Sequence, residues 1–153
     1  MENRPALIQV MQSHRIGHLA TVDSHGVPHI VPVCFVYDGT AVYSAIDHKP
    51  KRTGGYSMKR LQNILQHPQV AFLVDHYEED WQQLYYVLLR GTATILEDGT
   101  ERQQALTLLE AKYPQYQERQ LARSSGLVIK ILPSSIRQWS WQSAERESRG
   151  VEG

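Results

Sequence analysis

The chain has 153 residues, 41% of them hydrophobic, and 16 basic residues balance 16 acidic ones, so the formal net charge at pH 7 is zero. This length predicts one domain with a sizeable core, and the neutral balance argues against bulk attraction to nucleic acid or to an anionic membrane. The single cysteine, Cys34, excludes an internal disulfide and lies in an apolar run, which indicates a buried thiol in a reducing compartment. No apolar run has membrane-spanning length and no signal-peptide core is present, so we expect a cytoplasmic protein.

The chain begins with a predicted helix. Asn3 can cap its first turn, where Pro5 is tolerated because an N–H at that position has no partner within the helix. Leu7 and Met11 then fall on one face. We expect this helix, over residues 1–13, to cover a core that is formed elsewhere.

Three antiparallel strands are predicted next, over residues 16–22, 27–37 and 41–46. The second contains Pro28 and Pro32. Proline cannot donate to a ladder, so this strand is expected at an edge, a bulge or a barrel opening. An Asp-Gly pair between the second and third strands is a strong hairpin signal.

A helix and a fourth strand follow. Leu61, Ile64 and Leu65 have the spacing of a buried helical stripe. A strand over residues 69–77 is expected after the helix, which the His-Pro pair before that strand ends.

The last part of the chain predicts two more strands around a second long helix. The strand over residues 84–96 contains Gly91, a position suited to the bend that a closed sheet needs. Thr100 and Gln103 have the spacing of a capping box, and residues 127–132 open the final strand. The residues expected to face inward on this helix are Ala105, Leu106 and Leu109.

Six strands joined by short turns, with helices confined to crossovers, predict a mainly β fold. We expect a six-stranded antiparallel barrel with peripheral helices, in one domain over residues 1–142. Residues 143–153 are polar and are expected to form a disordered tail. Strands with prolines at their edges leave unpaired ladder groups and apolar faces, so a symmetric homodimer is expected.

The loop after the third strand carries Lys49, Lys51 and Arg52 and leads into the first long helix. Ammonium and guanidinium groups beside a helix N-terminus can hold one phosphate. A solvated basic loop is the competing interpretation, and these residues alone leave the choice open.

Motifs for other chemistry are absent from the sequence. It contains no G-x-G-x-x-G, P-loop, G-x-S-x-G or C-x-x-C pattern. His25 and His29 have no partnering cysteine or clustered carboxylate, so no metal site is expected. Trp81, Trp139 and Trp141 are interpreted as core or interface residues, because aromatic residues are common in both settings.

The series RIGHLATVDSHGVPHIVPVCFVYDGTAVYSAIDHKPKR, LQNILQHPQVAFLVDHYEEDW and LLRGTATIL, in this order and spacing, resembles the pyridoxamine 5′-phosphate oxidase-like split-barrel family. The resemblance covers residues 10–142. Within the family, the D-H-K-P-K-R and D-H-Y-x-x-D-W segments are most similar to the subgroup of F420-dependent oxidoreductases.

The resemblance implies a homodimeric split β-barrel, with FMN or the deazaflavin coenzyme F420 bound between the subunits. The floor of the pocket would come from Pro32, Val33 and Cys34, the ring would be flanked by Tyr43, Ser44 and Ala45, and the phosphate would be bound by Lys49, Lys51 and Arg52. The partner subunit would close the far side through Arg137, Trp139 or Trp141. Pyridoxamine phosphate oxidase itself carries a serine-arginine-lysine run and an arginine-histidine clamp that this sequence lacks, so its substrate is not expected here.

The function implied is hydride transfer between bound F420 or FMN and a small organic substrate, with the coenzyme carrying the redox chemistry. Tyr43 or His48 could supply a proton. The alternative, from another class, is a protein that binds or carries flavin, deazaflavin or haem without turnover. Nucleic-acid binding is disfavoured by the neutral charge balance.

Overall fold

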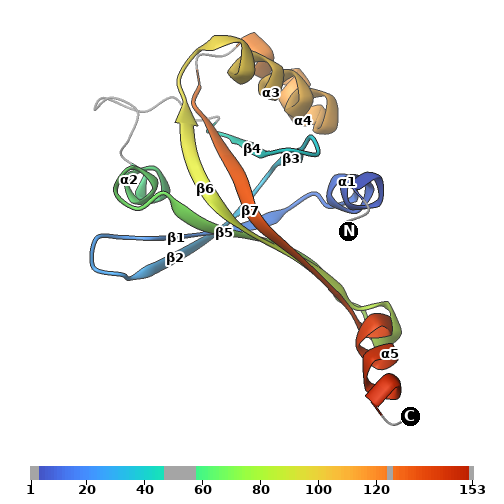
Figure 1. Cartoon of the computed structure of the whole chain (residues 1–153). Coiled ribbons are helices and arrows are strands. Elements are labelled where there is room, and N and C mark those ends of the chain that lie inside the picture. Colours follow the sequence, from blue (N-terminus) through green and yellow to red (C-terminus); the bar gives the residue numbers. More distant parts are fainter. Residues whose placement is uncertain (1–3, 47–57, 124–125, 152–153) are drawn as a thin grey trace.

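The computed structural model describes residues 4–46, 58–123 and 126–151 (Figure 1). Its strands form one antiparallel sheet in the order β2-β1-β5-β6-β7-β4-β3. They are β1 (Gly17–Val22), β2 (Pro28–Val33), β3 (Val36–Tyr37), β4 (Val42–Ala45), β5 (Gln69–His76), β6 (Tyr85–Leu96) and β7 (Val128–Ser140). The expected mainly β fold is confirmed, and β2, with its prolines, lies at a sheet edge as predicted.

The helices are spread around the curved sheet rather than forming a layer of their own (Figure 1). They are α1 (Arg4–Ser13), α2 (Lys59–Gln66), α3 (Gly99–Lys112), α4 (Pro114–Glu118) and α5 (Trp141–Val151), with 3₁₀ turns η1 (Trp81–Gln83) and η2 (Leu121–Arg123). Within the described residues, none of these helices combines the length and the apolar character required to cross a membrane.

Over the described residues the sheet has seven strands, so the expected count of six was wrong. The predicted second strand is two strands, β2 and β3, separated by Cys34 and Phe35. The Tyr113 hydroxyl accepts from the Phe35 N–H at 2.9 Å and lies 3.0 Å from the Phe35 carbonyl. With its backbone groups held by this side chain, Phe35 leaves the ladder, and the chain passes from one edge of the sheet to the other.

Two apolar clusters form the core. The larger one lies inside the curved sheet and is covered by α1 and α2, where Leu7, Met11 and Leu61 are fully buried. The Phe35 ring meets the Phe72 ring there at a centroid distance of 4.9 Å. The smaller cluster joins β3 and β4 to α3 and includes the three inward residues expected on that helix: Ala105, Leu106 and Leu109.

Gly91 marks the bend in the sheet, as predicted. The register of β6 against β7 shifts between Arg90 and Gly91, and a Cβ at Gly91 would lie 2.3 Å from the Leu132 carbonyl oxygen. Beyond this bulge the strands β5, β6 and β7 continue away from the barrel and end at α5 (Figure 1). We call residues 75–87 and 138–151 the arm.

Three local expectations were wrong. Leu65 is 60% exposed, because α2 turns only Leu61 and Ile64 of the predicted stripe inward. The capping box does not form: Asp98 is the N-cap residue of α3, and the Gln103 side chain instead donates to the Ala122 carbonyl. The polar tail is helical up to residue 151, as α5, because Ala, Glu, Gln and Arg favour helix whatever their polarity.

Candidate functional site

The ends of β2 and β4 are brought together next to the Phe35 break, so the structure joins two of the predicted site segments. The Ser44 hydroxyl donates to the Cys34 carbonyl at 2.8 Å. Val33, Ser44 and Ala45 are buried, whereas Pro32 is exposed. Ser44 and Ala45, the last two residues of β4, have small side chains.

Tyr43 is turned away from this junction. Its hydroxyl donates to Glu101 Oε2 at 2.7 Å, and Lys130 Nζ lies 2.6 Å from the same oxygen. Burial, followed by the hydrogen bond to Glu101, raises the pKa of Tyr43. The hydrogen bonds from Lys130 and Tyr43 lower the pKa of Glu101. Tyr43 thus ties β4 to α3 and β7, and its proton is held by a carboxylate of its own chain.

Cys34 is half-buried, not fully buried as expected. It lines a cavity of about 490 Å³ together with Arg15, Ile16, Tyr113, Pro114, Gln115 and Tyr116. Lys112 donates to the Phe35 carbonyl at 2.9 Å and lies 3.9 Å from the centroid of the Phe35 ring. Burial lowers the pKa of Lys112 to about 8. The break between β2 and β3 is therefore held by groups from the end of α3.

The predicted phosphate residues Lys49, Lys51 and Arg52, and the proton-donor candidate His48, lie outside the described residues. Their flanks are placed: β4 ends at Ala45 and α2 begins at Lys59. The basic segment therefore connects the Ser44 junction to the start of α2, and its role in phosphate binding stays a prediction.

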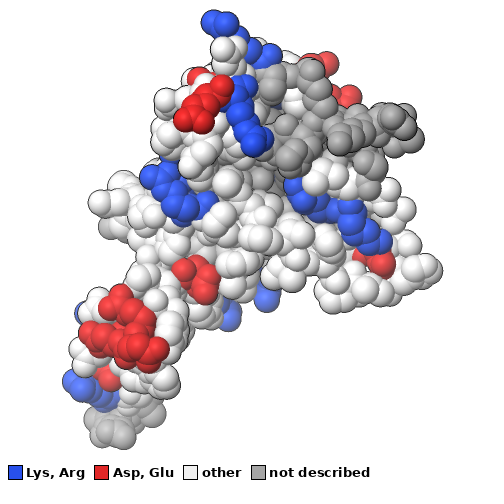
Figure 2. Space-filling model, turned by 180° about the vertical axis from the view of Figure 1, so that it is seen from behind, with Lys and Arg blue, Asp and Glu red and all other residues white. Residues whose placement is uncertain are grey.

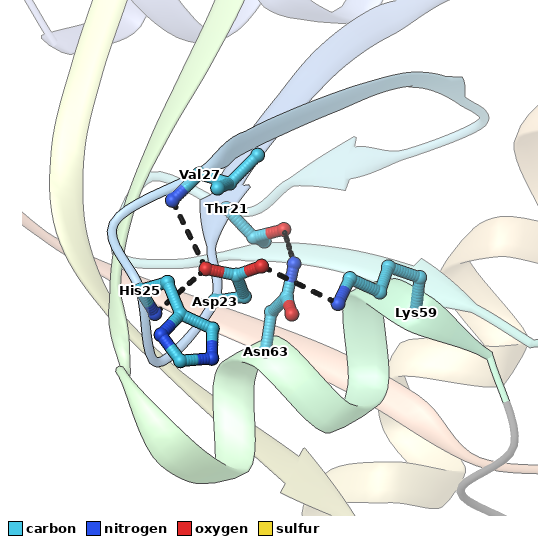
Figure 3. Close-up of polar contacts among 6 residues, drawn as sticks. All are labelled: Thr21, Asp23, His25, Val27, Lys59 and Asn63. Carbon is cyan, nitrogen blue, oxygen red and sulfur yellow. Dashed lines mark hydrogen bonds and ion pairs between the residues drawn. The ribbon is translucent and has the colours of Figure 1, made fainter.

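A polar network fixes the first turns of α2 (Figure 3). The buried Asn63 amide donates to Thr21 Oγ1 at 3.0 Å, and Lys59 Nζ lies 3.6 Å from Asp23 Oδ2. The other Asp23 oxygen accepts from the backbone N–H groups of His25 and Val27, at 2.8 and 3.0 Å. These two N–H groups, Val27 first, lower the pKa of Asp23. The turn after β1 thereby anchors the end of α2 that follows the basic segment.

Sequence reasoning missed this network, although one signal was present. Asn63 lies between Leu61 and Ile64 in the apolar stripe, and a polar residue at a buried helical position needs a hydrogen-bond partner. The partner, Thr21, is 42 residues away in the sequence, so local patterns could not identify it.

Pro32, Arg137 and Trp139 lie on the outer face, the side of β2-β1-β5-β6-β7 that faces away from the barrel core. Pairing registers place a row of outward residues straight across these strands, which we call the central row: Pro32, His18, Leu73, Leu88 and Arg137. Pro32 and Arg137 are its two ends, four strand spacings or about 19 Å apart. One chain alone does not bring them together.

Trp139 belongs to the arm, where it stacks on Tyr86 at a centroid distance of 5.5 Å. Trp81 meets Trp141 edge to face at 5.8 Å. The tryptophans thus pack within the arm, at a distance from β4 along the sheet (Figure 1). Among the described residues, no cluster of three or more His, Cys, Asp or Glu side chains could hold a metal ion.

Comparison with known proteins gives a family and a curated relative. The sequence profile of the family described as pyridoxamine 5′-phosphate oxidase matches residues 4–140. A 5a,11a-dehydrotetracycline/5a,11a-dehydrooxytetracycline reductase of Streptomyces rimosus subsp. rimosus is 33% identical over 96 residues, which make up 60% of this chain and 63% of that protein. The chain thus spans less than two thirds of the length of this relative.

Solved structures share the fold. A haem storage protein from Vibrio cholerae has a TM-score of 0.68 at 16% identity, over 92% of this chain and 95% of the other. An FAD-binding protein from Mesorhizobium loti has a TM-score of 0.64 at 18% identity, over 90% of this chain and 92% of the other. Identities this low support the fold alone.

Proposed function

The chain belongs to the pyridoxamine 5′-phosphate oxidase family, and from that premise we propose that it is an oxidoreductase that binds a flavin-type coenzyme. The coenzyme is F420, with FMN as the alternative. Coenzyme of this type, when bound, supplies the hydride exchanged with a small organic substrate. The similarity to a reductase of tetracycline-like compounds supports reduction as the reaction type, and the FAD-binding structural relative is consistent with a flavin-type ligand.

The observation that carries the proposal is the junction of β2 and β4. The Ser44–Cys34 hydrogen bond aligns the ends of both predicted ring-binding segments, and the chain leaves this junction directly into the segment that carries the predicted phosphate residues. Backbone groups at the end of β4 and the small residues Ser44 and Ala45 fit a flat ring better than bulky side chains would. Lys49, Lys51 and Arg52 would hold the phosphate.

The residues of the chain have a binding and orienting role in this mechanism. β4 and Val33 would form a rigid surface for the ring, because they are buried and packed against the core. The Tyr43 hydroxyl is engaged by Glu101, so a proton for the substrate would come from His48 or from water rather than from Tyr43.

A homodimer with its coenzyme sites between the subunits is part of the proposal. Pro32 and Arg137 are exposed at opposite ends of the central row, so Arg137 or Trp139 can reach a site at Pro32 only from a second copy. We place the protein in the cytoplasm, because that compartment is reducing and keeps a free thiol such as Cys34 reduced.

A parallel titration of the apo-protein with F420 and with FMN, followed by ligand fluorescence and thermal shift, tests the proposal. Tight F420 binding with weak FMN binding supports the deazaflavin enzyme, and the reverse supports a flavin enzyme. Turnover with a panel of enones and quinones then separates an enzyme from a carrier, since a carrier leaves the reduced coenzyme unoxidised. If neither coenzyme binds, the proposal fails, and haem is the next ligand to test, as in the Vibrio cholerae relative.

A further inference from the structure

Two histidines contact one tyrosine where α1 ends beside the arm. His14 directly follows α1, and its Nε2 lies 2.8 Å from the Tyr85 hydroxyl, with the two rings edge to face at a centroid distance of 5.6 Å. His76 stacks on the Tyr85 ring at a centroid distance of 5.2 Å. Since α1 covers the barrel core, and His76 and Tyr85 belong to the arm, this cluster joins the arm to the barrel.

Within the arm, His76 has a carboxylate partner. Its Nε2 lies 2.5 Å from Glu78 Oε2. The acidic residues of this part of the arm are Asp75, Glu78, Glu79 and Asp80. Figure 2 shows acidic side chains gathered on the arm, at the lower left. A positive charge on His76 is therefore balanced by a carboxylate close by.

The surroundings of His14 are less favourable to a proton. Burial is the largest cause that lowers the pKa of His14, followed by the charge of His76 on β5, and the charge of Lys112 on α3 lowers this pKa as well. Asp75 raises it, and the partial negative charge at the C-terminal end of α1 acts in the same direction as Asp75. The balance is a lowered pKa, so a proton on His14 is disfavoured while the ring stays at Tyr85.

This lowered pKa makes the contact sensitive to acid. A His14 ring that leaves Tyr85 for water regains its ordinary pKa of 6.5, so the released state binds a proton that the closed state resists. The contact is therefore most stable above about pH 6.5 and weakens as the pH falls below that value. Leu7 and Met11 keep α1 in the core, so the arm can be released while the barrel stays closed.

We propose that His14, Tyr85 and His76 form a pH-sensitive contact that holds the arm against the end of α1 at neutral pH and releases it in mild acid. Positive charges on His14 and His76 repel each other at the same tyrosine, and Lys112 adds to the repulsion on His14. The released arm carries His76 away together with its partner Glu78. The contact requires no coenzyme, so a test on apo-protein is independent of the proposed function.

NMR of the histidine and tyrosine rings tests the release in the full chain. Nuclear Overhauser contacts between the His14 and Tyr85 rings are expected at about pH 8 and should be lost by about pH 5, with a midpoint below 6.5. In His14→Gln, whose side chain can bond the Tyr85 hydroxyl without titrating, contacts between position 14 and Tyr85 should persist at both pH values. Wild-type contacts that survive at pH 5, or the same acid loss in His14→Gln, overturn the proposal.

Two substitutions with opposite expected signs test the charges. His76→Gln removes a cation and should raise the pKa of His14, so that its contact with Tyr85 survives to lower pH. Asp75→Asn removes a carboxylate and should lower the pKa of His14. His67→Gln, the same change as His76→Gln at an exposed histidine after α2, is the control and should leave the His14 titration unchanged. A His14 titration that is unmoved by both substitutions, or moved in one direction by both, overturns the proposal.

Discussion

The buried amide of Asn63 and the buried hydroxyl of Thr21 form a hydrogen bond of 3.0 Å that joins α2 to β1 across 42 residues of sequence. Each of these polar groups is 1% exposed, so neither can exchange its partner for bulk water without local opening. The bond fixes the helix that follows the predicted phosphate segment.

Asn63→Leu is expected to destabilise the fold by about 1–3 kcal/mol, because the Thr21 hydroxyl would be left buried without this partner. The measurement is the free energy of unfolding from urea titration. The double variant Thr21→Val/Asn63→Leu removes both polar groups. Its loss in free energy of unfolding should be smaller than the summed losses of the two single variants. Strict additivity would show that the two groups do not interact.

Gly91→Ala is expected to destabilise the protein by about 1–3 kcal/mol, because the new Cβ would overlap backbone atoms at the bulge. The nearest of these, the Leu132 carbonyl oxygen, would be only 2.3 Å away. Gly150→Ala, in α5 with open space around the new Cβ, is the matched control and should be neutral or slightly stabilising. Equal melting temperatures for the two variants would contradict the close approach at Gly91.

Lys51→Ala and Arg52→Ala are expected to weaken binding of F420 or FMN by about ten- to a hundredfold, since a charge-assisted hydrogen bond contributes about 1.5–3 kcal/mol. Arg146→Ala, an exposed cation on α5, is the control. Comparing FMN with riboflavin, which lacks the phosphate, shows whether the loss concerns that group. Wild-type affinity in both variants would remove the phosphate site.

The pKa of Lys112 predicts a rise in stability at alkaline pH. Burial lowers this pKa to about 8 from the model-compound value of 10.5, so between these two pH values the unfolded chain binds more protons than the folded one. Stability therefore increases with pH across this window. Urea titrations of the wild type should give a larger free energy of unfolding at about pH 10 than at pH 7, and this increase should be smaller in Lys112→Met. Identical pH profiles would mean that the amine is solvated in the folded state.

Local patterns predicted the elements well where the cause was local. Gly91 indicated the bend because a glycine inside a strand permits close backbone approach, and Pro28 indicated an edge strand because it lacks an N–H. The break at Phe35 could not be predicted, because the hydroxyl that holds it belongs to Tyr113, 78 residues later.

The candidate site was predictable mainly through resemblance to a family. Residue patterns gave no reason to place Pro32 and Arg137 in one row, since that depends on the registers of four strand pairs. Tyr43 was expected at the ring, but its hydroxyl bonds Glu101 on α3, a contact set by tertiary packing. The roles of Lys49, Lys51 and Arg52 remain predictions.

The two-residue break at Cys34 and Phe35 has a consequence for how the barrel opens. The two edge strands of the sheet, β2 and β3, are consecutive in the sequence. The two edges are therefore connected by the covalent chain at Cys34 and Phe35 and not by strand pairing. Breaking the contacts between the Tyr113 hydroxyl and the Phe35 backbone would release both edge strands in one event. Amide hydrogens of β2 and β3 should then exchange with solvent as one cooperative unit, despite having no strand partner in common.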